Sequence, residues 1–169
     1  IAIAVSGGPD SMALAYCAKN WAAENNTTVR AFVVDHGLRV ESASEAQETQ
    51  KRLAAMGIVV EILTWEHEPV ISRLHITARK ARYKLLIDAC KRHGIRDLLL
   101  AHQLEDQAET ILMRLAKGSG IDGLAGMARI KTMDGVRLLR PFLSVPKTRL
   151  IATCEAAKIP FVTDPSNTS

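Results

Sequence analysis

Aromatic residues and cysteines are both scarce in this sequence, and each scarcity excludes a class of protein. Aromatic side chains make up 4% of the 169 residues, which is too few for a platform on which the bases of single-stranded nucleic acid could stack. The three cysteines, Cys17, Cys90 and Cys154, lie far apart in the chain and form no C-x-x-C motif. Their number and spacing argue against a disulfide framework or a zinc site and are typical of a reducing compartment.

Long hydrophobic runs are absent as well, since no apolar stretch approaches the roughly 18 residues that a membrane-spanning helix needs. The opening IAIAV is short, lacks a basic flank and has the composition of a strand, so it is not a signal peptide. We therefore expect a cytoplasmic protein with no membrane partner, or a mitochondrial or plastid one if the source is eukaryotic. Because the chain begins with Ile1 rather than Met, we expect a single domain, residues 1–169, excised from a longer protein.

What the sequence does contain is typical of a globular α/β domain: 47% of its residues are hydrophobic, and strand-like and helix-like runs alternate. The predicted strands are residues 1–5, 29–34, 58–64, 97–101 and 136–139, and the predicted helices are residues 11–24, 42–56, 74–93, 105–117 and 146–158. Several of the strands are almost entirely apolar, as parallel strands covered on both faces are. The pattern predicts a doubly wound, mostly parallel five-stranded sheet, with the glycine-rich residues 118–135 as a long loop.

Three clusters of polar residues lie where predicted strands end: Ser6–Ser11, Asp35–Arg39 and His102–Glu109. In doubly wound sheets, ligands bind beyond the carboxyl ends of the strands. The sequence therefore predicts a functional site at this edge of the sheet. The net charge of +4 is modest, but residues 73–96 carry eight basic side chains and one acid. This segment is either a solvated helix face or a surface for nucleic acid.

The Ser6–Ser11 loop, SGGPDS, connects the first strand directly to a helix. Gly7 and Gly8 can adopt positive φ and let a ligand approach the bare backbone, and successive N–H groups in such a turn attract anions. The helix that follows adds the positive end of its dipole, and Asp10 or Ser11 is expected to cap it. The loop is neither G-x-x-x-x-G-K-[ST], since it has no lysine, nor G-x-G-x-x-G. A plain strand–turn–helix junction remains the alternative.

Ser-Gly-Gly-Pro-Asp-Ser resembles the S-G-G-x-D-S signature of the PP-loop ATP pyrophosphatases, whose fold is that of the adenine nucleotide α-hydrolases. In that group the loop holds the β- and γ-phosphates of ATP while a nucleophile attacks the α-phosphorus. Later segments resemble the tRNA(Ile)-lysidine synthetase family in the correct order along the whole chain. These segments are VDHGLR (34–39), ARKARY (78–83), AHQLEDQAET (101–110), RPFL (140–143) and DPSN (164–167). The sequence departs from the family pattern at Gln103, where a second histidine is common, and at Glu105, where an aspartate is usual.

The resemblance implies an ATP-dependent ligase that acts on isoleucine tRNA with a CAU anticodon. The C2 carbonyl oxygen of the wobble cytidine attacks the α-phosphorus, pyrophosphate leaves, and free L-lysine then displaces AMP to give lysidine. It also implies C-terminal tRNA-binding domains beyond this chain. The oligomeric state stays open, and a homodimer is one outcome.

The site residues follow from the resemblance together with the chemistry of each side chain. The ATP-binding set is Ser6, Gly7, Gly8, Pro9, Asp10, Ser11, Asp35 and His36. Mg²⁺, which is held by carboxylates and phosphate oxygens, is assigned to Asp10, Asp106 and Glu109. The catalytic set is these three acids with Arg82, for the α-phosphate or RNA phosphates, and His102, as a base or orienting group. Weaker candidates for tRNA or substrate contacts are Arg39, Arg79, Asp164, Ser166 and Asn167.

Two other readings are open for the same residues. Another PP-loop ATP pyrophosphatase, of the tRNA thiolation or amidation type, would keep the loop and change the acceptor. Thiolation relatives use a paired cysteine system, and no close cysteine pair is present in this sequence. A module that binds ATP without chemistry is the third reading, and the acidic cluster after the fourth strand counts against it.

Overall fold

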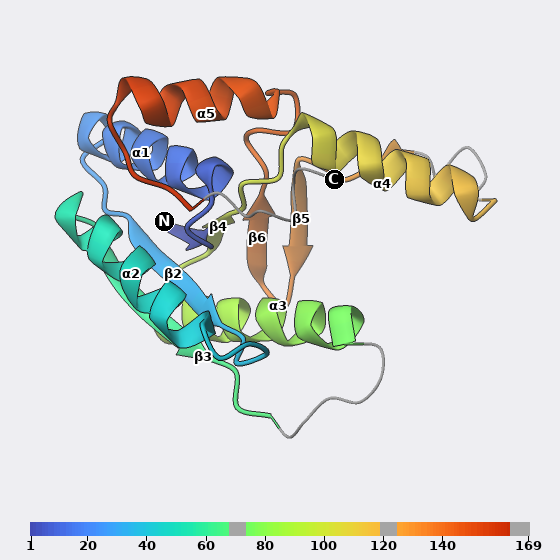
Figure 1. Ribbon diagram of the computed structural model, residues 1–169, viewed down its shortest axis with the longest axis horizontal. Helices are drawn as coiled ribbons and strands as arrows, with labels where there is room; N and C mark the ends of the chain where they lie inside the picture. Colours follow the sequence, from blue (N-terminus) through green and yellow to red (C-terminus); the bar gives the residue numbers. More distant parts are fainter. Residues whose placement is uncertain (68–73, 119–124, 163–169) are drawn as a thin grey trace.

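The computed structural model describes residues 1–67, 74–118 and 125–162, and a six-stranded sheet lies at its centre (Figure 1). The strands are β1 (Ala2–Val5), β2 (Arg30–Asp35), β3 (Val59–Thr64), β4 (Asp97–Leu99), β5 (Ile130–Met133) and β6 (Val136–Leu139). The helices are α1 (Pro9–Glu24), α2 (Ser42–Ala55), α3 (Leu74–Arg92), α4 (Leu104–Ala116) and α5 (Lys147–Ala156). Every predicted helix and strand is therefore confirmed to within a few residues.

The strand order is β3-β2-β1-β4-β6-β5, and all neighbouring pairs are parallel except β5 with β6. The chain moves outward from β1 to β3 and then returns to the other side of β1 with β4. The strand order thus reverses at the β1–β4 boundary, which is where sheets of this type bind their ligands. The predicted α/β class and doubly wound topology are confirmed.

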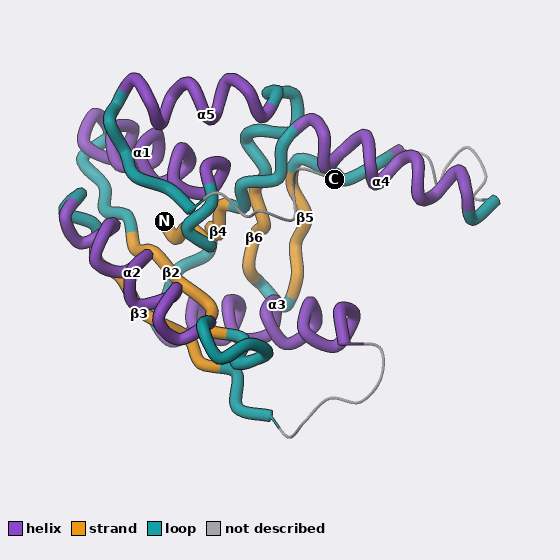
Figure 2. Tube along the Cα trace, in the orientation of Figure 1, coloured by secondary structure: helices purple, strands orange, loops and turns teal. Residues whose placement is uncertain are grey.

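Each face of the sheet has its own hydrophobic core because successive strand residues point to opposite faces. On one face Ile3 and Val5 of β1 pack with buried residues of α1, α2 and α5. On the other face Ala2 packs with Phe32 and with Leu86, Ile87 and other buried residues of α3. Figure 2 shows α1 and α5 together on one side of the strands and α3 on the other. This three-layer arrangement fixes the starts of α1, α4 and α5 near one edge of the sheet.

The predicted number of strands was wrong by one, because the expected loop at 118–135 contains β5. Residues 130–133 pair with β6 through a tight turn in which Asp134 has φ 47° and Gly135 has φ 83°. Positive φ at both central residues is characteristic of the hairpin turns that Asp-Gly favours. The Asp134-Gly135 pair was therefore the sequence signal for a hairpin within a segment that is otherwise rich in glycine.

Helix α4 extends away from the rest of the molecule (Figure 1), and none of its residues is buried. Gln107 holds it to the returning chain: its amide donates to the carbonyl of Met127 (3.0 Å) and accepts from the backbone N–H of Met127 (2.7 Å). Arg114 adds a hydrogen bond to the carbonyl of Gly126 (3.0 Å). No helix in the described part of the chain is long and apolar enough to span a membrane.

Candidate functional site

The Ser6–Ser11 loop follows β1 and is held in a fixed conformation. Gly7 has φ +86°, and a Cβ atom there would lie 2.4 Å from Oγ1 of Thr49, so both the backbone and the packing require glycine at this position. The Ser11 hydroxyl accepts from the backbone N–H of Ser6 (3.1 Å) and donates to the carbonyl of Gly8 (3.0 Å). These bonds close the loop around its own backbone and leave it shaped before any ligand binds.

One expectation for this loop was wrong. Gly8, with φ −73°, is the N-cap residue of α1 and has extended backbone. No side chain caps α1, so neither Asp10 nor Ser11 has the predicted capping role. The hydroxyl of Ser11 is engaged within the loop, and Asp10 points to the neighbouring helix starts. The N–H groups of the first turn of α1 therefore remain available to an anion.

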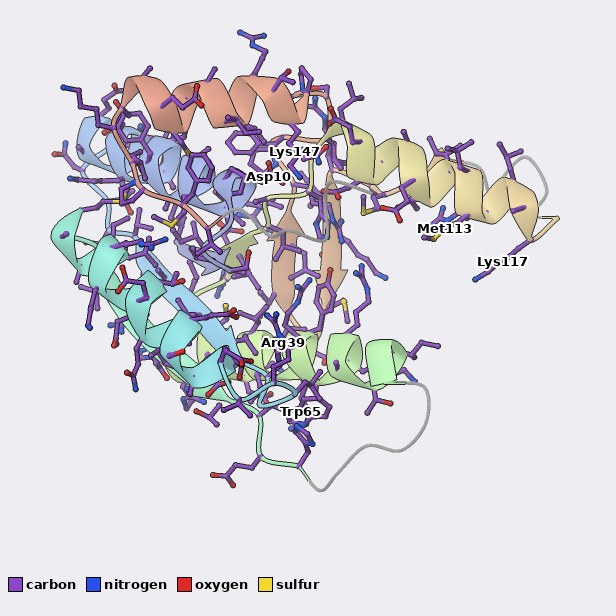
Figure 3. All side chains as sticks on the ribbon, viewed as in Figure 1. Asp10, Arg39, Trp65, Met113, Lys117 and Lys147 are labelled. Atoms are coloured by element: carbon purple, nitrogen blue, oxygen red, sulfur yellow. The ribbon has the colours of Figure 1, made fainter. Side chains whose placement is uncertain are left out.

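Asp10 is partly buried, and its Oδ1 atom is buried without a hydrogen-bond partner in the described residues. Burial raises the pKa of Asp10, the nearby charge of Lys147 opposes that rise, and the carboxylates of Asp106 and Glu105 add to it. Asp10 and Lys147 lie next to each other in Figure 3. An unpartnered buried carboxylate oxygen among further carboxylates is a place where a cation would be stabilised.

The start of α4 joins these acids through a capping box. The side-chain oxygen of Gln103 accepts from the backbone N–H groups of Glu105 and Asp106, and Asp106 accepts from the backbone N–H of Gln103 (3.0 Å). Gln103 is 3% exposed, and its side chain also favours the charged form of Asp10 by hydrogen bonding. Glutamine in place of the expected histidine therefore links the first helical turn of α4 to the Ser6–Ser11 loop.

Glu105 has a contact that sequence reasoning missed. Its carboxylate oxygens accept from the backbone N–H of Lys147 at 3.0 and 3.2 Å, which satisfies a free donor at the start of α5. The longer side chain at this position thus connects the first turns of α4 and α5. Glu109, one turn further along α4, is exposed. Of the two predicted carboxylates on α4, the structure brings Asp106 toward Asp10, while the part played by Glu109 stays a prediction.

His102 follows β4 and lies among cations. Burial lowers the pKa of His102 to about 4, with further lowering by the charges of Arg140, Arg82 and Arg79 and partial compensation by Asp106. Its Nδ1 atom is buried and has no partner in the described residues, and the same holds for Nε of Arg82. His102 is therefore a neutral imidazole near pH 7, which makes it a weak proton acceptor and suits an orienting role better than that of a strong base.

Arg140 was not among the predicted site residues, although it directly follows β6. It is 6% exposed, and its guanidinium donates to the carbonyl of Ala128 (2.7 Å) while its Nε lacks a partner in the described residues. It also lines an open hollow of about 290 Å³ beside Leu99 and Leu139. The sequence signal for Arg140 was its position directly after the predicted strand 136–139, at the carboxyl end of that strand.

The second polar cluster has mainly structural contacts. The Oδ1 atom of Asp35 accepts from the backbone N–H of Gly37 (3.0 Å) and from the hydroxyl of Ser42. The Nδ1 atom of His36 accepts from the backbone N–H of Leu38 (3.1 Å). Arg39 is exposed and pairs with Glu45 (2.9 Å). These side chains shape the turn after β2, so their predicted roles in ligand contact stay predictions.

The structure bears differently on the remaining predicted residues and on the predicted metal. Arg79 lies over the ring of Tyr83 with its guanidinium carbon 5.3 Å from the ring centroid. Asp164, Ser166 and Asn167 lie outside the described residues. In the described part of the chain no three His, Cys, Asp or Glu side chains gather closely enough to hold a metal by themselves. Mg²⁺ needs only one or two carboxylates when phosphates supply the other oxygens, so Asp10 and Asp106 fit it as partial ligands.

A family model described as a PP-loop domain matches residues 1–169. The chain belongs to the PP-loop family.

Curated relatives are similar to the chain over almost its whole length. It is 48% identical over 169 residues to the tRNA(Ile)-lysidine synthase of Rhodopseudomonas palustris and 45% identical to that of Bradyrhizobium diazoefficiens. Each alignment covers 99% of this chain, but 49% and 47% of those relatives. The chain thus spans about half the length of the curated relatives that it matches.

Solved structures support the fold. The U34-tRNA thiolase NcsA from Methanococcus maripaludis, which carries a [4Fe-4S] cluster, has a TM-score of 0.79 at 20% identity over 99% of this chain and 60% of that one. An NH₃-dependent NAD synthetase from Campylobacter jejuni has a TM-score of 0.55 at 16% identity over 94% of this chain and 63% of its own. Proteins with different activities therefore share this fold.

Proposed function

We propose that this chain is the adenylating domain of a tRNA(Ile)-lysidine synthase. The likeness at 45–48% identity to curated enzymes of that name, over 99% of the chain, is the observation that carries the proposal. The substrates would be ATP, free L-lysine and the wobble cytidine of isoleucine tRNA with a CAU anticodon. The products would be lysidine in the tRNA, AMP and pyrophosphate.

In this proposal the Ser6–Ser11 loop binds the β- and γ-phosphates of ATP. The loop is pre-shaped by the Ser11 hydrogen bonds, and the free N–H groups at the start of α1 face the same edge of the sheet. Asp10 and Asp106, with Glu109 as a further candidate, would hold Mg²⁺, which neutralises charge on the triphosphate. Fixed donors of this kind stabilise charge that develops in a transition state without reorganisation.

The acceptor side of the site is the boundary between β4 and β6. His102 lies three residues after β4 and Arg140 directly follows β6. Arg82 approaches from α3 with a buried Nε that has no partner in the described residues. Arg82 would bind a phosphate, either the α-phosphate of ATP or one of the RNA, by charge-assisted hydrogen bonds. Neutral His102 would orient the acceptor. Arg39, Arg79 and the 164–167 segment stay as candidates for contacts with the tRNA.

Thiolation is a weaker reading of the same fold. Cys90 and Cys154 are buried, Cys17 is exposed, and all three are free. Burial raises the pKa values of the Cys90 and Cys154 thiols to about 11, so neither is a reactive thiolate near pH 7. The similarity to the thiolase at 20% identity concerns the fold alone.

The decisive test uses the full-length protein with labelled ATP, L-lysine and an isoleucine tRNA transcript. We expect pyrophosphate release that depends on the tRNA, followed by lysine incorporation at the wobble position. A transcript with uridine at that position is the control and should give neither. ATP binding without any turnover would instead support a binding module, and sulfur incorporation would support the thiolation reading.

A further inference from the structure

We propose that Lys147 is a phosphate-contacting residue, whose ammonium reaches the polyphosphate held by the Ser6–Ser11 loop and supplies the positive charge that this loop lacks. The loop sequence SGGPDS contains one charged residue, Asp10, and no lysine or arginine. The proposal rests on the proposed function, because it requires ATP at this loop. It assigns a role to a residue that lies 136 positions beyond the end of the loop.

The packing of three helix starts holds Lys147 beside the loop. Its own backbone N–H donates to the Glu105 carboxylate at 3.0 and 3.2 Å, and the backbone N–H of Leu104 donates to the carbonyl of Val145 (3.1 Å). Toward the other end of α5 the thiol of Cys154 donates to the carbonyl of Pro9 (3.4 Å). Helix α5 is therefore attached to α4 through its first turn and to the start of α1 through Cys154.

The charges around the loop show why a cation is needed there. Asp10, Glu105 and Asp106 lie near one another. Among the charges that affect the pKa of Asp10, the two carboxylates raise it and Lys147 lowers it. A triphosphate brought to this edge would add about four negative charges beside three carboxylates. Each uncompensated like charge at such distances opposes binding. One ammonium on a flexible stem reduces that repulsion, and its three donors can follow the phosphate oxygens.

Lys147 also has the freedom that such a role requires. Its side chain is partly exposed, and Figure 3 shows it next to Asp10. In this structure its charge acts on Asp10. Binding of a magnesium–ATP complex would give Asp10 a second cationic neighbour, and the ammonium could then donate to phosphate oxygens. Glu105 holds only the backbone of Lys147, so this side-chain movement would leave the cap of α5 intact.

The test is ATP binding by the full-length protein, measured by titration calorimetry without tRNA, with Mg²⁺ and again with EDTA. Lys147→Met keeps the aliphatic stem and removes the charge, and we expect it to weaken ATP binding about 10- to 100-fold. Lys147→Arg should bind ATP within about threefold of the wild type, because it keeps the charge. Adenosine, which has no phosphate, should bind equally to all variants. Lys117→Met, at the far end of α4 (Figure 3), is the matched control and should bind ATP normally.

Unchanged ATP affinity in a folded Lys147→Met variant would overturn the inference while leaving the proposed function intact. Equal losses for Lys147→Met and Lys147→Arg, or a parallel loss of adenosine binding, would assign Lys147 a structural role and also overturn it. A wild-type protein that binds no ATP would overturn the proposed function itself. Thermal melting of each variant keeps misfolding from being read as lost affinity.

Discussion

At the scale of single residues, Asp106 combines two roles that one substitution separates. Its carboxylate accepts the backbone N–H of Gln103 in the capping box, and its charge acts on Asp10. Asp106→Asn keeps an acceptor oxygen for the cap and removes the charge. We expect pyrophosphate release to fall at least about 100-fold, as loss of a metal-binding carboxylate should cost, with tRNA binding nearly unchanged in a filter assay. Turnover at the wild-type rate would remove Asp106 from the proposed metal site.

Arg82 and Lys91 offer a matched pair on the same helix, α3. Arg82 is partly buried and its Nε atom lacks a partner in the described residues, whereas Lys91 is exposed near the helix end. If Arg82 binds a phosphate, Arg82→Ala should lower kcat/KM for tRNA modification about 10- to 100-fold. Lys91→Ala should change it less than about twofold. Equal effects in steady-state assays would mean that the basic segment acts only as a diffuse charged face.

His102 gives a prediction for stability against pH. Its pKa is lowered from the usual histidine value of 6.5 to about 4 in the folded protein, chiefly by burial. The unfolded chain therefore binds a proton more readily, so the free energy of unfolding should fall as the pH drops from about 6.5 to about 4. The shift corresponds to about 3 kcal/mol over that window. Above pH 6.5 both states are neutral, and His102 makes no contribution that varies with pH.

Urea unfolding at several pH values checks this prediction, with His102→Gln as the comparison. Other groups also titrate in acid, so the difference between the two proteins is the informative quantity. We expect the wild type to lose more stability than the variant between pH 7 and pH 4. Parallel stability curves would show that the imidazole is not buried in its neutral form.

At the scale of elements, the junction of α4 and α5 depends on Glu105. Its removal would leave the backbone N–H of Lys147 without its carboxylate acceptor. Glu105→Ala should lower the free energy of unfolding by about 1 kcal/mol, which is typical for loss of a helix cap. Glu109→Ala, an exposed change one turn along the same helix, should leave stability within about 0.5 kcal/mol. Denaturant unfolding of both variants tests the pair, and equal losses would contradict the capping role.

The elements also show what could be predicted from the sequence. Each expected helix and strand is present, because the apolar runs that predicted the strands are buried in the two cores. Ile3 lies in one core and Leu98 in the other. The strand β5 was missed because Ile130–Met133 is short and mostly exposed, which leaves little hydrophobic periodicity to detect. Its evidence lay in the Asp134-Gly135 turn. Residues in loops were harder still, since the capping choice between Gly8, Asp10 and Ser11 depends on backbone angles that the sequence does not display.

At the scale of the whole molecule, the sequence predicted which edge of the sheet carries the candidate site, but only some of the side chains that lie there. The rule that parallel strands bind ligands at their carboxyl ends correctly brought Asp10, His102 and Asp106 to one edge. Lys147 and Arg140 also belong to this edge. The neighbour of Lys147 is Asp10 and that of Arg140 is His102, and both lie far away in the sequence. Only the packing of α5 on α1 and of β6 on β4 therefore reveals them.

The last prediction concerns which activities residues 1–169 should retain without the rest of the longer protein. One sheet with both faces covered by helices is a complete folding unit, so residues 1–169 alone should unfold in a single cooperative transition. If the proposed nucleotide site at the β1–β4 edge needs no residue from outside this chain, ATP at 100 times its Kd should add about 2.7 kcal/mol of stability. The chain spans about half of its curated relatives, and we infer that recognition of the tRNA needs the other half. The isolated domain should therefore show the ATP-dependent rise in Tm but form no lysidine with a tRNA that the full-length protein modifies. Efficient lysidine formation by the domain alone would mean instead that the basic face of α3 and the acceptor side of this site are sufficient to select the tRNA.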